Sequence, residues 1–139
     1  MPLLLTIVTP QGPAYEGHVD SVVLPGSEGR FGVLEGHERF LAPLKIGEVE
    51  LRGAAGTEYA ALSGGFADVG AESVVVLAET CELAHEIDVA RAQRAEREAQ
   101  AELERLRTES AEEHHFRLHQ AALERAVARI QTSGRAGGG

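Results

Sequence analysis

Four charged residues of this chain are spaced so that together they could hold an anion. Arg125 and Arg129 are four positions apart on one predicted helix, and Asp88 and Arg91 open an earlier one. If the two helices fold back antiparallel, the start of the first lies beside the end of the second, and the four side chains converge. Three arginines around one carboxylate would suit a triphosphate. An inter-helix salt-bridge network would use the same residues.

No catalytic motif accompanies them. The glycine-rich residues 26–32 lack the Gly-Lys-Ser/Thr ending of a phosphate-binding loop, and the only lysine is Lys45. No nucleophile has a base beside it. His115 and His119 have a spacing that can bind metal, but the sequence compels no third ligand, so no metal site is predicted. Cys81 is the only cysteine, which indicates a small core residue or a free thiol in a reducing compartment.

Charge is divided unevenly along the chain. Residues 1–86 carry 13 acidic and 4 basic residues, whereas residues 87–139 carry nine of each. An acidic protein without a basic patch is not expected to bind nucleic acid. The arginines of the second half line up on helical faces, which indicates either a solvated surface or an electrostatic docking face.

No targeting or membrane-spanning segment is predicted. The apolar residues 3–5 lack a basic flank and are soon interrupted by Thr6, Thr9 and Pro10. The longest other apolar run, residues 74–78, is far shorter than the roughly 18 residues that a membrane helix needs. We therefore expect a cytoplasmic protein that meets a membrane only through its partners.

The first part of the chain has the pattern of a β domain. Short strand candidates are separated by glycine and proline turns at a spacing typical of antiparallel sandwiches and barrels. The candidates are residues 3–8, 19–24, 48–51, 59–62, 65–69 and 73–77.

The second part has the pattern of a helical hairpin. After Glu86 there is no proline, and no glycine before Gly134. Asp88 is a suitable N-cap, residues 108–113 interrupt the helical periodicity, and Ser110 is a second candidate cap. The apolar stripes are Ala92, Ala95, Ala99, Leu103 and Leu106 in the first helix, and Phe116, His119, Leu123, Val127 and Ile130 in the second.

The seam between these helices should be weak. Its first stripe is mostly alanine, which buries little apolar area at about 25 cal/mol per Å². The hairpin is therefore expected to depend on docking against the β domain or a partner. Weak docking suits a conformational switch, although an unstable chain end would show the same pattern.

Four segments together give the chain a family resemblance. They are residues 25–37 (P-G-x-E-G-x-x-G-V-L-x-x-H), 44–47 (L-K-I-G), 64–69 (G-G-F-A-D-V, before a valine-rich strand) and 87–92 (I-D-x-x-R-A). In this order and spacing they resemble the epsilon subunits of bacterial F-type ATP synthases, over about residues 3–131. One departure is Arg39, which stands where the family usually has proline.

The resemblance implies a flattened antiparallel β-sandwich of about ten strands followed by an α-helical hairpin. The expected boundaries are residues 1–86 for the sandwich, 87–132 for the hairpin and 133–139 for a flexible tail. The sandwich would bind the gamma subunit and the ring of c subunits. The protein would then lie at the cytoplasmic face of the bacterial plasma membrane, peripheral and held there through the complex.

The resemblance also implies two sets of site residues. In some bacterial members the folded hairpin holds a regulatory ATP, and the matching positions here are Glu82, Ile87, Asp88, Arg91, Ala92, Arg125 and Arg129. The segment between the helices is about one turn longer here. In an extended state the hairpin would rise to the alpha/beta catalytic head. The bases available for an inhibitory contact with the beta subunits are Arg94, Arg97, Arg105, Arg107 and Arg117.

The predicted function is accordingly that of a non-catalytic rotor subunit, which needs no cofactor and inhibits ATP hydrolysis through its hairpin. No group is placed to activate water, so any bound ATP would be regulatory. The alternative is a stand-alone ATP-sensing or scaffold protein whose hairpin serves as an adaptor.

Overall fold

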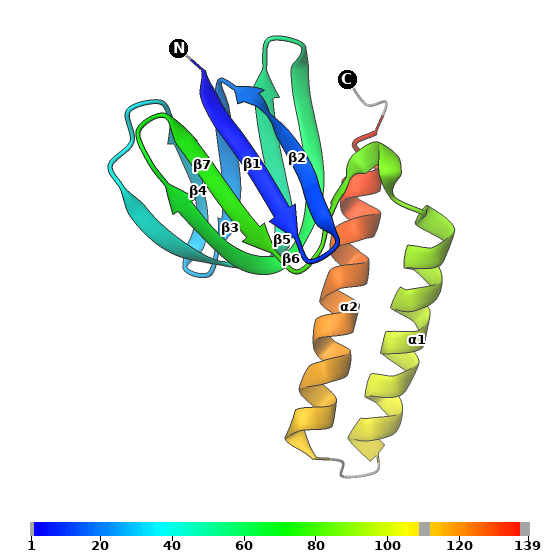
Figure 1. Ribbon diagram of the computed structural model, residues 1–139. Coiled ribbons are helices and arrows are strands. Elements are labelled where there is room, and N and C mark those ends of the chain that lie inside the picture. The colour runs from blue at the N-terminus through cyan, green and yellow to red at the C-terminus, as the bar shows by residue number, and fades with distance from the viewer. Residues whose placement is uncertain (1, 109–111, 137–139) are drawn as a thin grey trace.

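A computed structural model describes residues 2–108 and 112–136 of the chain. It shows a β domain with two antiparallel helices at its side (Figure 1). The strands are β1 (Leu3–Thr9), β2 (Gly12–Val19), β3 (Ser21–Gly26), β4 (Gly29–Leu34), β5 (Phe40–Gly53), β6 (Gly56–Val69), β7 (Ser73–Ala78) and β8 (Cys81–Leu83). A 3-10 turn, η1 (Ala84–Glu86), leads into α1 (Val89–Thr108), and α2 (Glu113–Ser133) follows.

The strands form one continuous path that folds over itself into a sandwich. Its order is β2-β1-β7-β6-β5-β3-β4, and β8 pairs with β6 beside this path. All pairs are antiparallel except β1 with β7. β1, β2 and β7 form one layer, and β3 and β4 lie behind them in the other (Figure 1).

The two long strands β5 and β6 belong to both layers, and this changes the strand count. The sequence predicts separate strands at residues 59–62 and 65–69, whereas both lie in the 14-residue β6. Gly64 and Gly65, at φ 98° and 142°, bend that strand without ending it. Before the bend β6 pairs with β8, and after it with β7. The described residues therefore contain eight strands rather than about ten.

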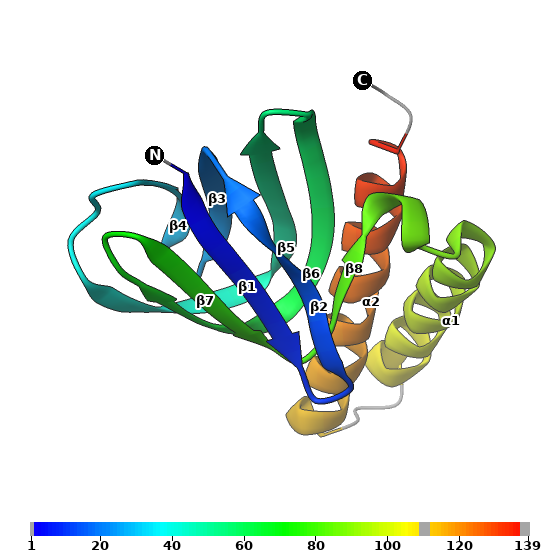
Figure 2. The ribbon, with the colours of Figure 1, turned by 45° about the horizontal axis from the view of Figure 1, so that its top comes forward.

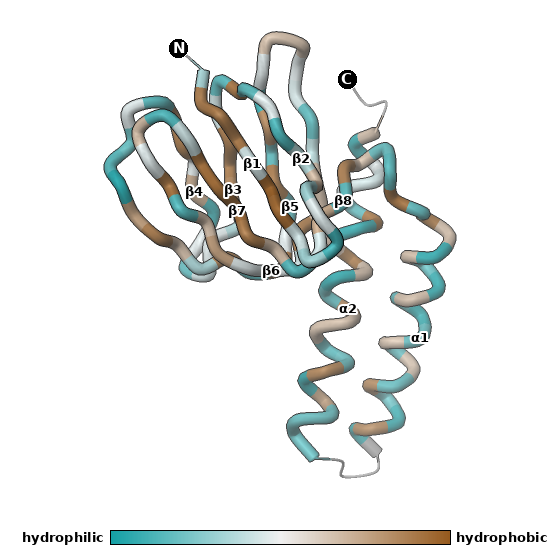
Figure 3. Tube along the Cα trace, viewed as in Figure 1, coloured by the Kyte–Doolittle hydropathy of each residue, from teal (hydrophilic) through white to brown (hydrophobic). Residues whose placement is uncertain are grey.

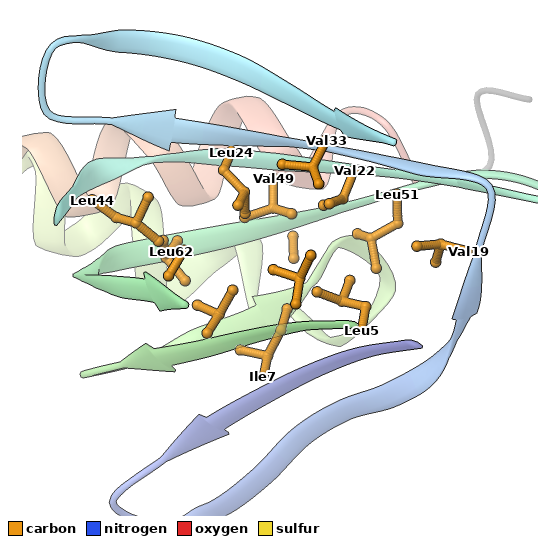
Figure 4. Close-up of a cluster of buried hydrophobic side chains, with 14 of the residues drawn as sticks. Leu5, Ile7, Val19, Val22, Leu24, Val33, Leu44, Val49, Leu51 and Leu62 are labelled. Atoms are coloured by element: carbon orange, nitrogen blue, oxygen red, sulfur yellow. The ribbon is translucent and has the colours of Figure 1, made fainter. Parts of the chain in front are cut away.

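The core fills the space between the two layers (Figure 4). In β7 the side chains alternate strictly between exposed and buried, as expected where one face packs and the other faces outward. The largest fully buried side chains are Leu3, Leu5, Ile7, Val22, Leu24, Val33, Val49, Leu51, Leu62, Val69, Val74 and Val76. This core depends on branched aliphatic residues, as the scarcity of aromatic residues predicts.

α2 lies between α1 and the sandwich. α2 packs against α1 on one side and against β5 and β6 on the other. Figure 2 shows β8 running beside α2. The hairpin carries few apolar residues among many polar ones (Figure 3). In α1 the buried seam consists of Ala92, Ala99, Leu103 and Leu106, which are four of the five residues predicted for it.

The ends of the helices agree with the sequence at one boundary and differ at the other. α1 ends at Thr108 and α2 begins at Glu113, which confirms the predicted break. Ser110, the candidate second cap, lies outside the described residues. The tail is predicted from residue 133, whereas in the structure Ser133 belongs to α2 and Arg135 contacts Glu48. Residues 137–139 lie outside the described part.

Candidate functional site

The start of α1 is built as its sequence predicts. Asp88 precedes the first helical residue, and its Oδ1 accepts a hydrogen bond of 3.1 Å from the backbone N–H of Arg91. This satisfies one of the donors that a helix N-terminus leaves unpaired, so the predicted N-cap is confirmed. Ile87, which is 8% exposed, is buried immediately before the cap. Together these contacts hold Asp88 and Arg91 at the junction between the two domains.

The other side of the site comes from the end of α2. Arg129 donates from Nε to Oε1 of Glu82 over 2.5 Å and from Nη2 to Oγ1 of Thr80 over 3.4 Å. Thr80 in turn donates from Oγ1 to Oγ of Ser63 over 2.6 Å. The arginine is thus the point at which α2 is attached to the segment that leads into β8.

A cavity of about 660 Å³ lies between these elements. Its walls are the turn between β1 and β2, the start of β8, the first two turns of α1, and Arg129 from α2. The lining residues are Thr9, Gln11, Gly12, Pro13, Ala14, Thr80, Cys81, Glu82, Glu86, Asp88, Arg91, Ala92, Ala95 and Arg129. Its size falls within the range of about 300–1,000 Å³ that is common for small-molecule sites.

Five of the seven residues proposed for ATP line this cavity. They are Glu82, Asp88, Arg91, Ala92 and Arg129. The other two do not line it. Ile87 is buried beneath the start of α1, and Arg125 lies one turn before Arg129, half-buried on α2.

The charge of the cavity differs from the sequence-based expectation. Three carboxylates, Glu82, Glu86 and Asp88, line it against two arginines, Arg91 and Arg129. The predicted surplus of positive charge is therefore absent from the described lining. Glu86 was not among the predicted site residues because it lies outside the I-D-x-x-R-A motif. Its Oε1 accepts a hydrogen bond of 3.1 Å from the backbone N–H of Leu83.

Cys81 is the nucleophilic group of the cavity, and its surroundings suppress its reactivity. Burial raises the pKa of the Cys81 thiol to about 12, and the carboxylates of Glu86 and Glu82 add to the shift. Both causes disfavour the thiolate. The thiol is therefore protonated at neutral pH, which agrees with the sequence interpretation of a small core residue or a free thiol.

The turn between β1 and β2 is the part of the lining that the sequence analysis missed. The sequence predicts only that a glycine- and proline-containing turn separates the first two strand candidates, because nothing local indicates which distant helix a turn will face. Its neighbour Thr9 is held in place by donating from Oγ1 to the carbonyl of Gly12 over 3.0 Å. The turn closes the cavity from the sandwich side.

Comparison with known proteins places both domains in one family. Residues 2–84 match the β-sandwich domain of the ATP synthase delta/epsilon chain, and residues 85–134 match its long α-helix domain. The chain belongs to the delta/epsilon chain family of ATP synthase. The resemblance seen in the sequence is thereby confirmed. Members of this family are non-catalytic subunits of the central stalk of F-type ATP synthase.

The chain is also similar to individual members of the family along almost its whole length. It is 42% identical to an ATP synthase epsilon chain from Geobacter sp. (strain M21), covering 96% of this chain and 95% of the relative. It is 38% identical to one from Halalkalibacterium halodurans, covering 97% and 100%. A chain in the structure of Euglena gracilis mitochondrial ATP synthase aligns with a TM-score of 0.75 at 25% identity, covering 97% and 81%.

The arginines proposed for the inhibitory contact fall into two groups. Arg94 and Arg97 are exposed on α1. The other three are paired within their own helices: Arg105 with Glu102, Arg107 with Glu104 over 3.7 Å, and Arg117 with Glu113 over 2.7 Å. The pairing reduces the charge that these three present to a partner.

Among residues 2–108 and 112–136, no three His, Cys, Asp or Glu side chains lie close enough together to hold a metal ion. His119 instead lies 3.9 Å from Glu102 across the two helices. In the same part of the chain, no helix combines the length and apolar composition needed to cross a membrane.

Proposed function

We propose that the sandwich attaches this subunit to the rotor and that the hairpin acts as a brake on ATP hydrolysis, applied by undocking from the sandwich and released by docking. The carrying observation is that both family domains are present, while the hairpin packs on the sandwich mainly through α2 and the seam between α1 and α2 is rich in alanine. Contacts of this kind leave the docked and undocked states within a few kcal/mol of each other, as a switch requires.

The outer face of the sandwich supports the rotor attachment. Leu41, Phe66 and Leu77 are 68%, 52% and 57% exposed. Phe66 lies opposite Leu77, and Asp68 lies opposite both Leu41 and Val75, so these side chains neighbour one another across β5, β6 and β7. Exposed apolar side chains gathered on one face mark an interaction site, and here they surround the exposed Asp68, which lies between Leu41 and Val75. We assign this rotor patch (Leu41, Phe66, Val75 and Leu77) to the gamma subunit and the c ring.

The brake would act through arginines on the hairpin. Arg94 and Arg97 are exposed and would meet acidic segments of the catalytic beta subunits first, while Arg105, Arg107 and Arg117 would have to leave their partners. Exposed ion pairs contribute only about 0–1 kcal/mol each, so inhibition would need several together. It should therefore weaken as salt rises, because the Debye length falls from about 10 Å at 0.1 M to about 3 Å at 1 M.

ATP would oppose the brake by binding only the docked form. The proposed site is the cavity between the domains, since two of its walls are helices that leave when the hairpin undocks. A ligand shifts such an equilibrium only by its differential affinity for the two states. No resident cofactor is proposed, and in the cell the subunit would lie at the cytoplasmic face of the bacterial plasma membrane, held there by the complex.

Deleting residues 87–139 tests this function in the assembled synthase. The truncated subunit should still assemble with gamma and the c ring, and ATP hydrolysis should rise, most clearly at low ATP. The control is the complete complex measured over the same range of ATP and salt. Failure of residues 1–86 to assemble would contradict the rotor role. Equal hydrolysis at every ATP concentration would contradict the brake.

A further inference from the structure

The end of α2 makes a second polar attachment to the sandwich, separate from the cavity. Thr132 is fully buried and donates from Oγ1 to Oε2 of Glu48 in β5 over 3.1 Å. Arg135, two residues beyond the helix, donates to both oxygens of the same carboxylate, from Nη2 over 3.1 Å and from Nε over 3.3 Å. Its guanidinium carbon lies 4.7 Å above the ring of Tyr59 in β6.

These contacts make Glu48 the acceptor of three hydrogen bonds from the end of the hairpin. The Glu48 side chain is 11% exposed, whereas that of Arg135 is 51% exposed. A two-pronged bond between guanidinium and carboxylate fixes geometry as well as charge, and the aromatic ring adds an attraction for the cation. When the hairpin leaves, water can solvate Glu48 again, so breaking the attachment leaves no buried unpaired charge.

The attachment does not involve the residues that line the cavity. Arg129 contacts Glu82 and Thr80, which belong to the cavity wall. Glu48, Thr132 and Arg135 are all absent from that wall. A ligand that displaced Glu82 from Arg129 would therefore leave this second attachment in place.

We propose that Glu48, Thr132 and Arg135 form a latch that holds the hairpin in the docked state whether or not the cavity is occupied. This inference rests on the proposed function, because a latch matters for regulation only if the hairpin is a brake. The latch sets how often the hairpin is free to reach the catalytic head, and ATP acts in addition to it.

The isolated full-length protein allows a direct test of docking. Spin labels at Glu72→Cys and Gln120→Cys, in a Cys81→Ser background, would report the distance between sandwich and hairpin. The variants are Arg135→Gln, Glu48→Gln and the two together, measured without nucleotide. Thr132→Val removes one donor at nearly constant volume. Arg30→Gln, on the edge strand β4, is the charge-matched control.

Each of Arg135→Gln and Glu48→Gln should raise the ratio of undocked to docked protein about three- to tenfold, a small effect because the half-exposed Arg135 is partly screened by solvent. The double variant should go no further than the singles, because the two residues act on each other. Thr132→Val should give a smaller rise, and Arg30→Gln none. Unchanged distances in the single variants, or full additivity in the double variant, would overturn the latch.

The same variants in the assembled synthase separate the latch from the proposed brake. If both are correct, Arg135→Gln should lower ATP hydrolysis in the complete complex, because the freed hairpin inhibits more often. Undocking in the isolated protein with unchanged hydrolysis would uphold the latch and contradict the brake. Docking that resists all variants would contradict the latch whatever the hydrolysis rate.

Discussion

Cys81 shows how strongly the junction between the domains controls single residues. Its raised pKa, about 12, leaves almost no thiolate at pH 8, whereas an ordinary thiol near 8.5 is partly ionised. We expect alkylation of the folded protein at pH 8 to be slower than that of a free thiol by a factor on the order of a thousand. Mass spectrometry after timed labelling would measure the alkylation rate. If the folded protein were labelled as fast as the protein unfolded in urea, the burial of Cys81 would be contradicted.

The same shift predicts how stability depends on pH. Because the folded pKa of Cys81 lies above the unfolded one, its contribution is fully present below about pH 8.5. That contribution is lost as pH rises from about 8.5 towards 12, since the unfolded chain ionises first. Cys81→Ser should lack this part of the decline, and urea unfolding at several pH values would show the difference.

The arginines of the junction make a second prediction at the residue scale. If ATP occupies the cavity, losing one charge-assisted bond in Arg91→Ala or Arg129→Ala should weaken binding about 10- to 100-fold. Arg125→Ala is the matched comparison on α2, and its effect should be smaller because Arg125 is not part of the cavity wall. Calorimetric titration would measure all three. Equal losses, or none, would contradict this placement of the site.

Whether the sequence predicted the contacts of these residues depended on how far apart the contacting residues lie along the chain. The cap formed by Asp88 and Arg91 was predicted, because it involves only neighbouring residues. The contact between Glu82 and Arg129 spans 47 positions, and the family resemblance rather than any local pattern brought the two together. Arg135 was assigned to a flexible tail, because glycine and alanine around it hide a contact with a strand 87 positions away.

At the scale of elements, the bend in β6 explains why more strands were predicted than the structure contains. Consecutive glycines are a turn signal in most sequences. Here a Cβ on Gly65 would lie 1.9 Å from the carbonyl oxygen of Leu77, so glycine is required for the close approach of β7. The helices were easier to predict, because their periodicity is local and their interruption is visible in the sequence.

That close approach gives a stability prediction. Gly65→Ala should destabilise the protein by at least about 2 kcal/mol, since it combines backbone strain with a clash. Gly29→Ala is the matched control, with φ 132° and no atom within 4 Å of the added Cβ. It should cost only the strain, about 1 kcal/mol. Urea denaturation would compare them, and equal costs would contradict the role assigned to the bend.

Across the whole molecule, the hairpin and the sandwich differ in charge, and this bears on the switch. The sandwich carries the net negative charge of the chain, whereas the acidic and basic residues of the hairpin region balance to a net charge of zero. Both polar attachments place an arginine of the hairpin region on a glutamate of the sandwich, Arg129 on Glu82 and Arg135 on Glu48. The sandwich therefore offers this region the same kind of acidic surface that we propose for the catalytic head.

Tyr59 lies where the optical properties of the chain would report on this exchange. The protein has no tryptophan and two tyrosines, so its intrinsic ultraviolet emission comes from Tyr15 and Tyr59. Tyr59 lies beneath the guanidinium of Arg135 and donates its hydroxyl hydrogen bond to Glu50 over 3.1 Å. Tyr15 lies in β2. Departure of the hairpin would thus alter the emission of Tyr59, giving an unlabelled protein its own fluorescent signal.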